Sequence, residues 1–397
     1  MKKNHADFFV QKKSWSFFKD DILHRYLPGY FQKILTTNKP VIYIDGFAGK
    51  GMFDDGNPGS PIIALDAIDA ALCNTKAVDP RITSYFIEST FYSDLTENIG
   101  GRSNVNIYNG RYQDNIEIIL KQVGNGNLFM YLDPFGVTDL NMGQFENLVT
   151  SDCHSVEFLL NFHSHGFFRI ACSALDIFYD EGDSEDIDEC EVILYFPKDK
   201  KVNTLNVIAG GDYWMQIVLD YRNGQIDGKE AERRITRQYC EKLRRSFEYV
   251  LEMPICSSLG SKPKYRMIFA TKKSPGYYLM AECMFKSIER IKLTHSKGQT
   301  TFLTETIENE PYDVNEEKQY LLSVIPKFPP ERITDIFVKY YQDRGLRCCP
   351  SELRKFISDF EKDGCLLVDR IPRLGKSGKP SRFLTETNRQ LVKIHKI

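Results

Sequence analysis

The sequence lacks the features of a membrane protein, of a secreted protein held by disulfides and of a zinc-binding protein. No apolar run approaches the roughly 20 residues needed to cross a bilayer, and the start, MKKNHADFFVQKKSW, has neither the apolar stretch nor the cleavage site of a signal peptide. None of the ten cysteines forms a C-x-x-C pair, so neither a disulfide framework nor a zinc ribbon is indicated. We therefore expect a cytoplasmic protein with reduced cysteines, no membrane association and no metal site.

Two common nucleotide-binding patterns are also absent from the one glycine-rich segment, VIYIDGFAGKGMF at 41–53. A Walker loop needs a glycine where Ile44 stands, and a Ser or Thr where Gly51 stands. The dinucleotide pattern G-x-G-x-x-G does not fit the glycine spacing either. The segment thus disfavours an NTPase, although glycines directly after an apolar strand still allow a cofactor to approach the backbone closely.

Length and charge indicate two domains of different character. A chain of 397 residues exceeds what one core usually serves, and its 42% hydrophobic content suffices for real cores. The net charge is −2, but residues 315–397 hold 17 Lys and Arg against 11 Asp and Glu. This basic C-terminal part is a weak electrostatic signature of nucleic-acid binding; a solvated tail is the alternative.

Strand-like and helix-like segments alternate through the first half of the chain. The expected strands are 41–45, 83–88, 105–108, 127–132 and 155–160, with helices at about 60–73, 90–99, 112–123 and 141–150. The strands are nearly continuous apolar runs, which is typical of a doubly wound parallel sheet covered on both faces. A ligand is then expected at the carboxyl ends of the strands. Two further strands, 249–255 and 264–271, predict a hairpin that closes the sheet edge.

The remaining segments predict an insertion, a linker and a small C-terminal domain. Residues 176–203 are expected to form an insertion, since nine Asp and Glu fall within 176–191, and residues 292–314 are expected to form a linker. Helices predicted at 316–325, 330–343 and 351–363, followed by a strand, a turn and a strand, match a winged helix-turn-helix domain at 315–397. The basic residues at its expected wing tip suit backbone phosphates. They are Arg370, Arg373, Lys376, Lys379 and Arg382. A protein-docking wing is the alternative.

The glycine-rich segment fits the form D-x-F-x-G-x-G, and here the sequence resembles the class I S-adenosylmethionine-dependent methyltransferases. The resemblance implies a cofactor loop formed by Asp45, Gly46, Phe47, Ala48, Gly49 and Gly51. It also implies that Glu88, at the end of the second strand, holds the ribose hydroxyls, because a carboxylate can accept from both. Glu88 follows Asp45 by 43 residues, about twice the gap of about 20 in dinucleotide folds. After the third strand, Asn109, Gly110 and Asp114 could meet the adenine, although any strand-to-helix turn contains such residues.

The fourth strand ends in MYLDPFGV, which resembles the [DN]-P-P-[YF] motif of methyltransferases that act on exocyclic amines of bases. The D-P-F-G form is closer to that of tRNA guanine-N2 dimethyltransferases. The resemblance implies that Asp133 and the backbone beside Pro134 accept hydrogen bonds from the amino group, while Phe135 stacks on the base before Gly136. The missing second proline makes an adenine-N6 acceptor doubtful, and a plain turn is the alternative. Asn161, after the fifth strand, could touch the base.

Over residues 15–290 the chain resembles the three-Cys-motif partner proteins, a bacterial and phage-associated group. The resemblance rests on YIDGFAGKG, GSPIIAL, FIES, YLDPFG, LLNFHSHGFFR and YRMIFATKKSPGYYLM. It implies a Rossmann-like domain at 1–291 and a neighbouring protein with three cysteines as a partner. Our leading hypothesis is a methyltransferase that uses S-adenosylmethionine on an exocyclic amine of a nucleobase in RNA or DNA. The alternatives are a methyltransferase-like binding or assembly subunit without turnover, and a protein methyltransferase.

Overall fold

The chain forms two compact units. The computed structural model describes residues 9–77, 79–149, 152–179, 196–256, 262–295, 312–374, 378–387 and 389–397. The units are Met1–Lys273 and Ser274–Ile397. The helix α12 (Ser274–His295), expected in the first domain from the sequence, groups with the C-terminal unit.

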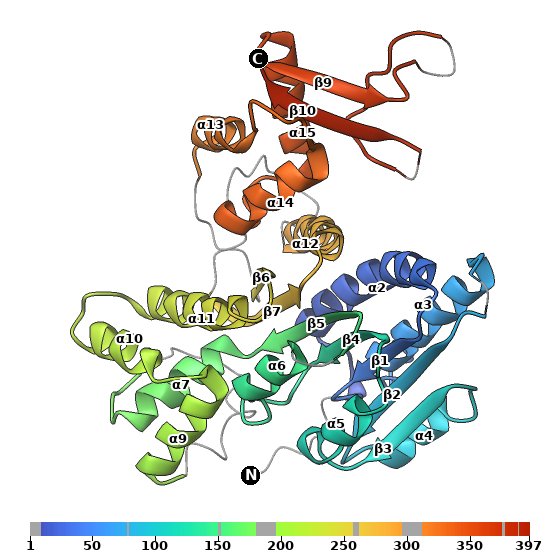
Figure 1. Cartoon of the computed structure of the whole chain (residues 1–397). Helices are drawn as coiled ribbons and strands as arrows, with labels where there is room; N and C mark the ends of the chain where they lie inside the picture. The colour runs from blue at the N-terminus through green and yellow to red at the C-terminus, as the bar shows by residue number, and fades with distance from the viewer. Residues whose placement is uncertain are drawn as a thin grey trace. The chain divides into compact units, whose positions relative to one another are not determined.

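A seven-stranded sheet organises the first unit (Figure 1). Its strands are β1 (Val41–Asp45), β2 (Ile82–Glu88), β3 (Val105–Asn109), β4 (Asn127–Leu132), β5 (Ser155–Phe162), β6 (Tyr249–Cys256) and β7 (Pro263–Thr271). The order is β3-β2-β1-β4-β5-β7-β6, with β1 to β5 parallel and β7 antiparallel to both of its neighbours. The predicted parallel sheet and edge hairpin are therefore confirmed as a Rossmann-like arrangement.

The order of the strands places a crevice beside β1 and β4. These two strands pair at the centre of the sheet and are buried along their whole lengths, as their apolar sequences require. The chain runs from β1 outward to β2 and β3, and then returns to β4 on the other side of β1. Such a reversal opens a crevice at the carboxyl ends of the strands, where ligands of doubly wound sheets bind.

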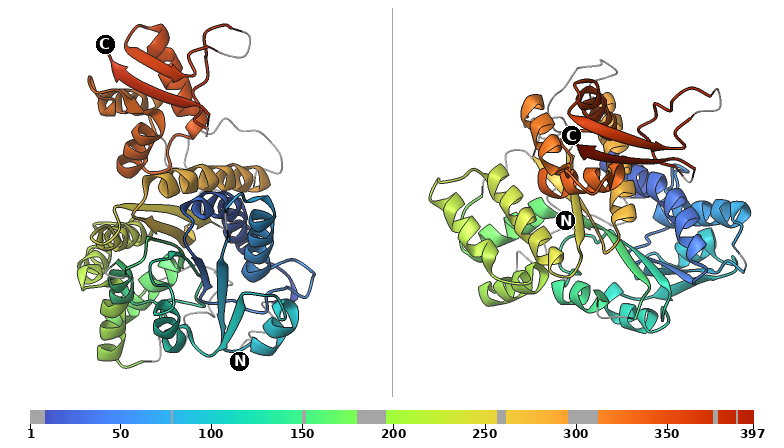
Figure 2. Two further views of the ribbon diagram at one scale, coloured as in Figure 1. Left: turned by 45° about the vertical axis from the view of Figure 1, so that its right-hand side comes forward. Right: turned by 45° about the horizontal axis from the view of Figure 1, so that its top comes forward.

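Helices cover both faces of this sheet (Figure 2). They are α2 (Ser14–Ile34), the short η1 (Leu35–Thr37), α3 (Ser60–Asn74), α4 (Tyr92–Ile99), α5 (Tyr112–Leu120), α6 (Met142–Val149), α7 (Ser164–Ala174), α9 (Lys198–Ala209), α10 (Tyr213–Arg222) and α11 (Gly228–Arg244). Pro28 lies inside α2 and does not end it. Tyr26 and Phe31, on either side of this proline, are fully buried, and their packing holds the helix together across it.

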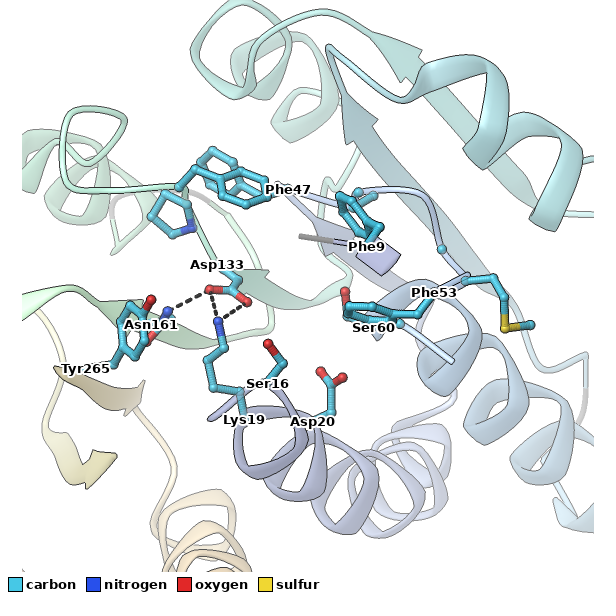
Figure 3. A pocket seen from close by; sticks show the side chains of 17 residues that line it. Phe9, Ser16, Lys19, Asp20, Phe47, Phe53, Ser60, Asp133, Asn161 and Tyr265 are labelled. Atoms are coloured by element: carbon cyan, nitrogen blue, oxygen red, sulfur yellow. Dashed lines mark hydrogen bonds and ion pairs between the residues drawn. The ribbon is translucent and has the colours of Figure 1, made fainter. Parts of the chain in front are cut away.

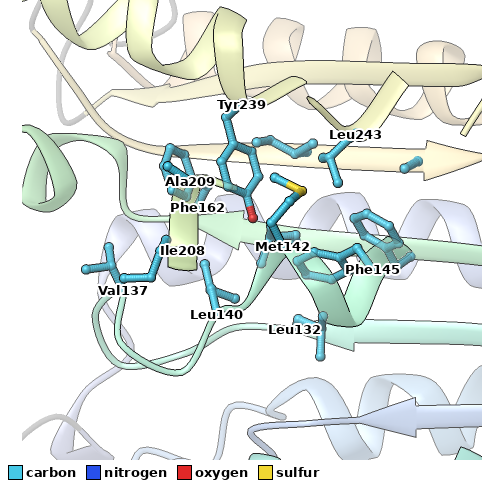
Figure 4. Packing of buried hydrophobic residues seen from close by; sticks show 14 of the residues in the cluster. Leu132, Val137, Leu140, Met142, Phe145, Phe162, Ile208, Ala209, Tyr239 and Leu243 are labelled. Carbon is cyan, nitrogen blue, oxygen red and sulfur yellow. The ribbon is translucent and has the colours of Figure 1, made fainter. Parts of the chain in front are cut away.

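One face of the sheet is buried by a large apolar cluster (Figure 4). Ile42 and Ile44 of β1 contribute to it, together with side chains from α5, α6, α7, α9, α10 and α11. Phe162 of β5 stacks on Tyr239 of α11 with ring centroids 4.5 Å apart. The opposite face carries Tyr43, whose ring stacks on Phe129 at 6.0 Å. The sheet is thus fixed from both sides, which makes its carboxyl edge a rigid support for a site.

The predicted acidic insertion is only partly described. Residues 180–195 lie outside the described residues. The later part, from Lys198, belongs to α9 and packs on α7, where the buried Lys201 donates to Ser173 Oγ at 2.8 Å. The last six residues of the predicted insertion are therefore part of an integral helix of the fold.

The second unit combines helices with a small antiparallel sheet. Its elements after α12 are α13 (Val314–Val324), β8 (Glu331–Arg332), α14 (Ile333–Arg344), α15 (Pro350–Lys362), β9 (Leu366–Ile371) and β10 (Leu391–Lys396). The sheet order is β8-β10-β9. The three helices agree with the prediction, but β9 pairs with β10, not with the segment directly after the turn. Most of the predicted linker, 296–311, lies outside the described residues. Among the described helices, none combines the length and apolar character needed to cross a membrane.

Candidate functional site

The glycine-rich loop after β1 packs too closely for side chains at two positions. A Cβ on Gly46 would lie 2.8 Å from both Leu132 and Tyr112. Gly49 has a φ of +60°, and a Cβ there would lie 2.8 Å from the ring of Phe9. The glycines are therefore required by the packing and the backbone conformation of the loop itself.

Asp45, at the end of β1, is buried beneath this loop. Its side chain accepts hydrogen bonds from Ser60 Oγ at 2.7 Å and from the Phe47 N–H at 3.2 Å. Burial raises the pKa of Asp45 to about 7, and the nearby Asp133 adds to this, while the bonds from Ser60 and Phe47 oppose it. Asp45 is fully shielded from solvent, so it shapes the loop and the start of α3 from below.

The raised pKa of Asp45 predicts how stability depends on pH. Because its pKa is higher in the folded chain than in the unfolded chain, ionisation destabilises the fold progressively from about pH 4 to pH 7. Asp45→Asn cannot ionise; its amide oxygen can still accept from the Phe47 N–H, and its amide N–H can donate to Ser60 Oγ. We expect its Tm relative to wild type to rise between pH 5 and pH 8, measured by thermal unfolding. Asp66→Asn, on the exposed face of α3, should show no such trend; a pH-independent difference for Asp45→Asn would contradict the assignment.

Glu88, the predicted ribose ligand, ties the loop to the end of β2. Its Oε2 accepts from the Gly49 N–H at 2.8 Å, and its Oε1 accepts from the N–H groups of Thr90 at 2.7 Å and Phe91 at 3.0 Å. A carboxylate has about four acceptor positions, so one remains on Oε2 for a ligand hydroxyl. Glu88 therefore organises two turns at once.

The residues predicted to meet the adenine lie beside Glu88. Asn109 is the register partner of Glu88 across the β2–β3 pair, and the Gly110 N–H donates to the Glu88 carbonyl at 3.1 Å. Asp114 is exposed in the first turn of α5. These residues share the same edge of the sheet as the loop, but they are not in the wall of the cavity described next.

An open cavity of about 650 Å³ lies at the carboxyl ends of β1 and β4 (Figure 3). Two predicted groups meet there: Phe47, Ala48, Gly49 and Gly51 of the loop, and Asp133, Pro134 and Phe135 of the fourth-strand motif. The other lining residues are Phe9, Ser16, Lys19, Asp20, Met52, Phe53, Gly59, Ser60, Asn161 and Tyr265. Gly136 has a φ of +100° and shapes the turn behind this wall. The structure thus joins the two motifs that the sequence singled out separately.

Asp133 is held by two partners inside the cavity (Figure 3). The ammonium of Lys19, from α2, lies 2.8 and 2.7 Å from its two carboxylate oxygens. The amide of Asn161, at the end of β5, donates to Oδ1 at 2.7 Å. These contacts fix the direction in which the carboxylate faces the cavity.

Aromatic rings form the opposite side of the cavity. Phe9, Phe53 and Phe91 form a buried cluster against which Phe135 packs. The ring of Phe9 meets that of Phe91 edge-on at 4.8 Å, and it covers Gly49. The segment that carries Phe9 is anchored, since the Asp54 N–H donates to the Phe9 carbonyl at 2.9 Å. Planar apolar walls of this kind suit a heteroaromatic ligand.

Several lining residues came from segments that sequence patterns did not mark. Lys19 and Ser16 lie on α2, which reads as an ordinary amphipathic helix, and Lys19 is 114 residues from Asp133. Phe9 precedes the first predicted helix altogether. No local spacing rule connects these residues with the motifs, so the fold was needed to find them.

The predicted phosphate-binding residues of the second unit differ in availability. Arg373, Lys379 and Arg382 are exposed around the turn of the hairpin, whereas Lys376 lies outside the described residues. Arg370 is engaged: its guanidinium bonds both carboxylate oxygens of Glu361 at 2.7 and 2.6 Å and the Phe383 carbonyl at 2.9 Å. Arg370 therefore fastens β9 to α15.

Comparison with known proteins gives only distant likenesses. No protein-family model and no curated protein matches the chain. Among solved structures, spermidine synthase from Thermotoga maritima has a TM-score of 0.32 at 8% identity, over 73% of this chain and 72% of that one. A Legionella pneumophila protein has a TM-score of 0.34 at 10% identity, over 70% of this chain and 91% of that one. The plantazolicin methyltransferase in complex with S-adenosylhomocysteine has a TM-score of 0.30 at 13% identity, over 68% of this chain and 90% of that one. Scores this low do not support an assignment of fold or function.

Proposed function

We propose that the first unit is a methyltransferase that takes its methyl group from S-adenosylmethionine and transfers it to an exocyclic amine of a nucleobase. The observation that carries the proposal is the meeting of the glycine-rich loop with Asp133, Pro134 and Phe135 on one cavity.

The residues present fit the proposed cofactor. Gly49 and Gly51 line the cavity, and the buried hydroxyl of Ser16 lines it without a hydrogen-bond partner among the described residues. Glu88 is not in the cavity wall itself, but it holds Gly49, which is, and it retains one acceptor position for a ribose hydroxyl. When bound, the cofactor would supply a methyl group on a positively charged sulfur. The aromatic rings of Phe9, Phe53 and Phe135 are suited to lie near such a cation.

The contribution of the chain to the reaction is orientation. Asp133 and Asn161 offer oxygen acceptors that can align an amino group, and Phe135 offers a face for the ring that bears it. Aligning the nitrogen lone pair with the methyl group removes much of the entropic barrier without a strong base. A base in a duplex must leave the stack to reach this cavity.

For the second unit we propose a winged-helix domain that binds the nucleic-acid backbone. The proposal is supported by the element order α13, β8, α14, α15, β9, β10 and by the exposed Arg373, Lys379 and Arg382. On α15, by contrast, Arg354 is bound to Tyr278 and Glu282 within the same unit. The exposed basic residues of the hairpin favour contacts to phosphates.

The phosphate-binding role of the hairpin predicts a change in salt dependence. In Arg373→Ala/Arg382→Ala we expect weaker binding to mixed-sequence RNA and DNA and a slope of log K against log salt that is smaller by about 1.4–1.8. Fluorescence anisotropy at several salt concentrations measures both. Lys286→Ala/Lys327→Ala removes two exposed charges elsewhere on the unit and is the matched control. Equal slopes for the two double variants would favour a protein-docking wing.

A second candidate is a binding or assembly subunit without turnover, acting beside a three-cysteine partner protein. One observation favours it: the ring of Phe9 covers Gly49 and contacts Phe91, next to the predicted ribose site. If that ring stays in place, the nucleoside part of a cofactor has no access to Glu88. Titration with S-adenosylhomocysteine separates the two candidates, because only the enzyme must bind it.

A further inference from the structure

The carboxylate of Asp133 already holds an aliphatic ammonium that the chain itself provides. Lys19 Nζ contacts both oxygens of Asp133, and the two side chains are 7% and 23% exposed. The same Nζ lies 5.0 Å from the centre of the Tyr265 ring. An ammonium between a carboxylate and an aromatic face is well accommodated. The position that a cationic amine substrate would seek is therefore filled.

Next to this ion pair, the cavity presents an acceptor of a different kind. Asn161 Oδ1 is buried and has no hydrogen-bond partner among the described residues, although Asn161 Nδ2 donates to Asp133. The residue is 1% exposed and lines the cavity. Ser16 Oγ, also in the wall, is buried and equally unpartnered. A buried acceptor without a partner destabilises the free protein and is satisfied when a donor enters.

From these two observations we infer that Lys19 is a specificity-determining residue: it neutralises Asp133 and so restricts the cavity to uncharged aromatic amines. This inference rests on the proposed function and names the residue that selects its substrate. An aromatic N–H₂ group can donate to Asn161 Oδ1 without bringing a charge. A protonated aliphatic amine would instead be placed beside the Lys19 ammonium, and like charges at such distances repel.

The chemistry of transfer agrees with this selection. The lone pair of the neutral amine nitrogen forms the new N–C bond while the C–S bond breaks and its electrons remain on sulfur. The nitrogen then carries the positive charge, and one of its protons leaves to water or to the Asp133 carboxylate, which gives the neutral methylamine. An ammonium has no lone pair and must first lose a proton. Excluding cations therefore excludes amines that are unreactive in their dominant form.

The test measures how tightly a small dication binds when Lys19 loses its charge. Putrescine is titrated calorimetrically into wild type, Lys19→Met and Lys19→Arg, with and without saturating S-adenosylhomocysteine. Methionine keeps most of the side-chain volume and leaves no hole in place of the lysine. The probe must therefore reach Asp133 through the cavity. We expect Lys19→Met to bind putrescine at least about tenfold more tightly than wild type, since the probe replaces the missing ammonium on Asp133. Lys19→Arg keeps the charge and should show no gain.

Two further variants keep the inference falsifiable if Lys19→Met folds poorly. Lys19→Gln also removes the charge, keeps an amide donor for Asp133, and should likewise strengthen putrescine binding. Lys39→Met removes the same charge at the opposite end of β1 and should have no effect. If neither Lys19→Met nor Lys19→Gln binds putrescine more tightly than wild type, the inference is overturned; tight binding of putrescine by wild type also overturns it. Failure of folded wild type to bind S-adenosylhomocysteine instead overturns the proposed function, so the two failures are distinguishable.

Discussion

Asp133→Ala is expected to slow methyl transfer about a hundredfold or more while S-adenosylhomocysteine still binds within a few fold of wild type. The reason is that the carboxylate orients the acceptor nitrogen, and small errors in alignment cost about that much in rate. The measurement is incorporation of labelled methyl from S-adenosylmethionine into a mixture of cellular RNA and DNA. Asp139→Ala is a matched control, because Asp139 follows in the same loop and pairs with Arg111 outside the cavity wall.

The same substitution also has a structural consequence that can be separated from catalysis. Without Asp133, the Lys19 ammonium is left buried and unpaired, which should lower the free energy of unfolding by about 1–3 kcal/mol. Asp133→Ala/Lys19→Met removes both charges and should recover most of this stability, but not the activity. If Asp133→Ala retains the wild-type rate, or the double variant regains it, the proposed role of Asp133 is wrong.

Glu88→Ala is expected to have the second large effect, on cofactor binding and on stability together. It leaves the N–H groups of Gly49, Thr90 and Phe91 without their acceptor, and each lost partner costs about 1–3 kcal/mol when the group stays buried. We expect at least about 3 kcal/mol of destabilisation by urea unfolding, and loss of S-adenosylhomocysteine binding by a hundredfold or more, because the glycine loop loses its anchor.

Glu88→Gln separates the two contributions of this side chain. The amide oxygen can still accept from Thr90 and Phe91, but the amide nitrogen then faces the Gly49 N–H. The effects of Glu88→Gln on stability and on S-adenosylhomocysteine binding should lie between those of wild type and Glu88→Ala. Glu97→Ala, exposed on α4, should change neither quantity. A Glu88→Ala protein as stable as wild type and equally able to bind the ligand would contradict the account of the loop.

The first unit was largely predictable because its strands carry strong signals. β1 and β4 are short, apolar and buried on both sides, so their sequences read as central strands. The motifs after them were recognisable as well, since glycines and a D-P-F-G turn stand directly at strand ends. The carboxyl ends of parallel strands lie at one edge of the sheet, and this rule predicts from the sequence that the two motifs lie close together.

The rest of the site depends on contacts that a local pattern does not encode. Lys19 reaches Asp133 only because α2 packs across the sheet through residues such as Tyr26. Arg370 looked like one more exposed charge of the hairpin. The strand register instead turns it toward α15, beside Glu361, because alternate residues of β9 face inward. Register and helix packing are set by the whole fold, so these roles were not readable from spacing.

The central claim, that the cavity between the glycine-rich loop and Asp133 is a cofactor site, is tested most directly by calorimetric titration with S-adenosylhomocysteine. Wild type and Ala48→Leu are compared, since Ala48 lines the cavity and the larger side chain narrows it without removing a hydrogen-bonding group. We predict one binding site in wild type and clearly weaker binding in Ala48→Leu, with both proteins folded. Absence of binding by folded wild type, or equal binding by the two proteins, would contradict the claim.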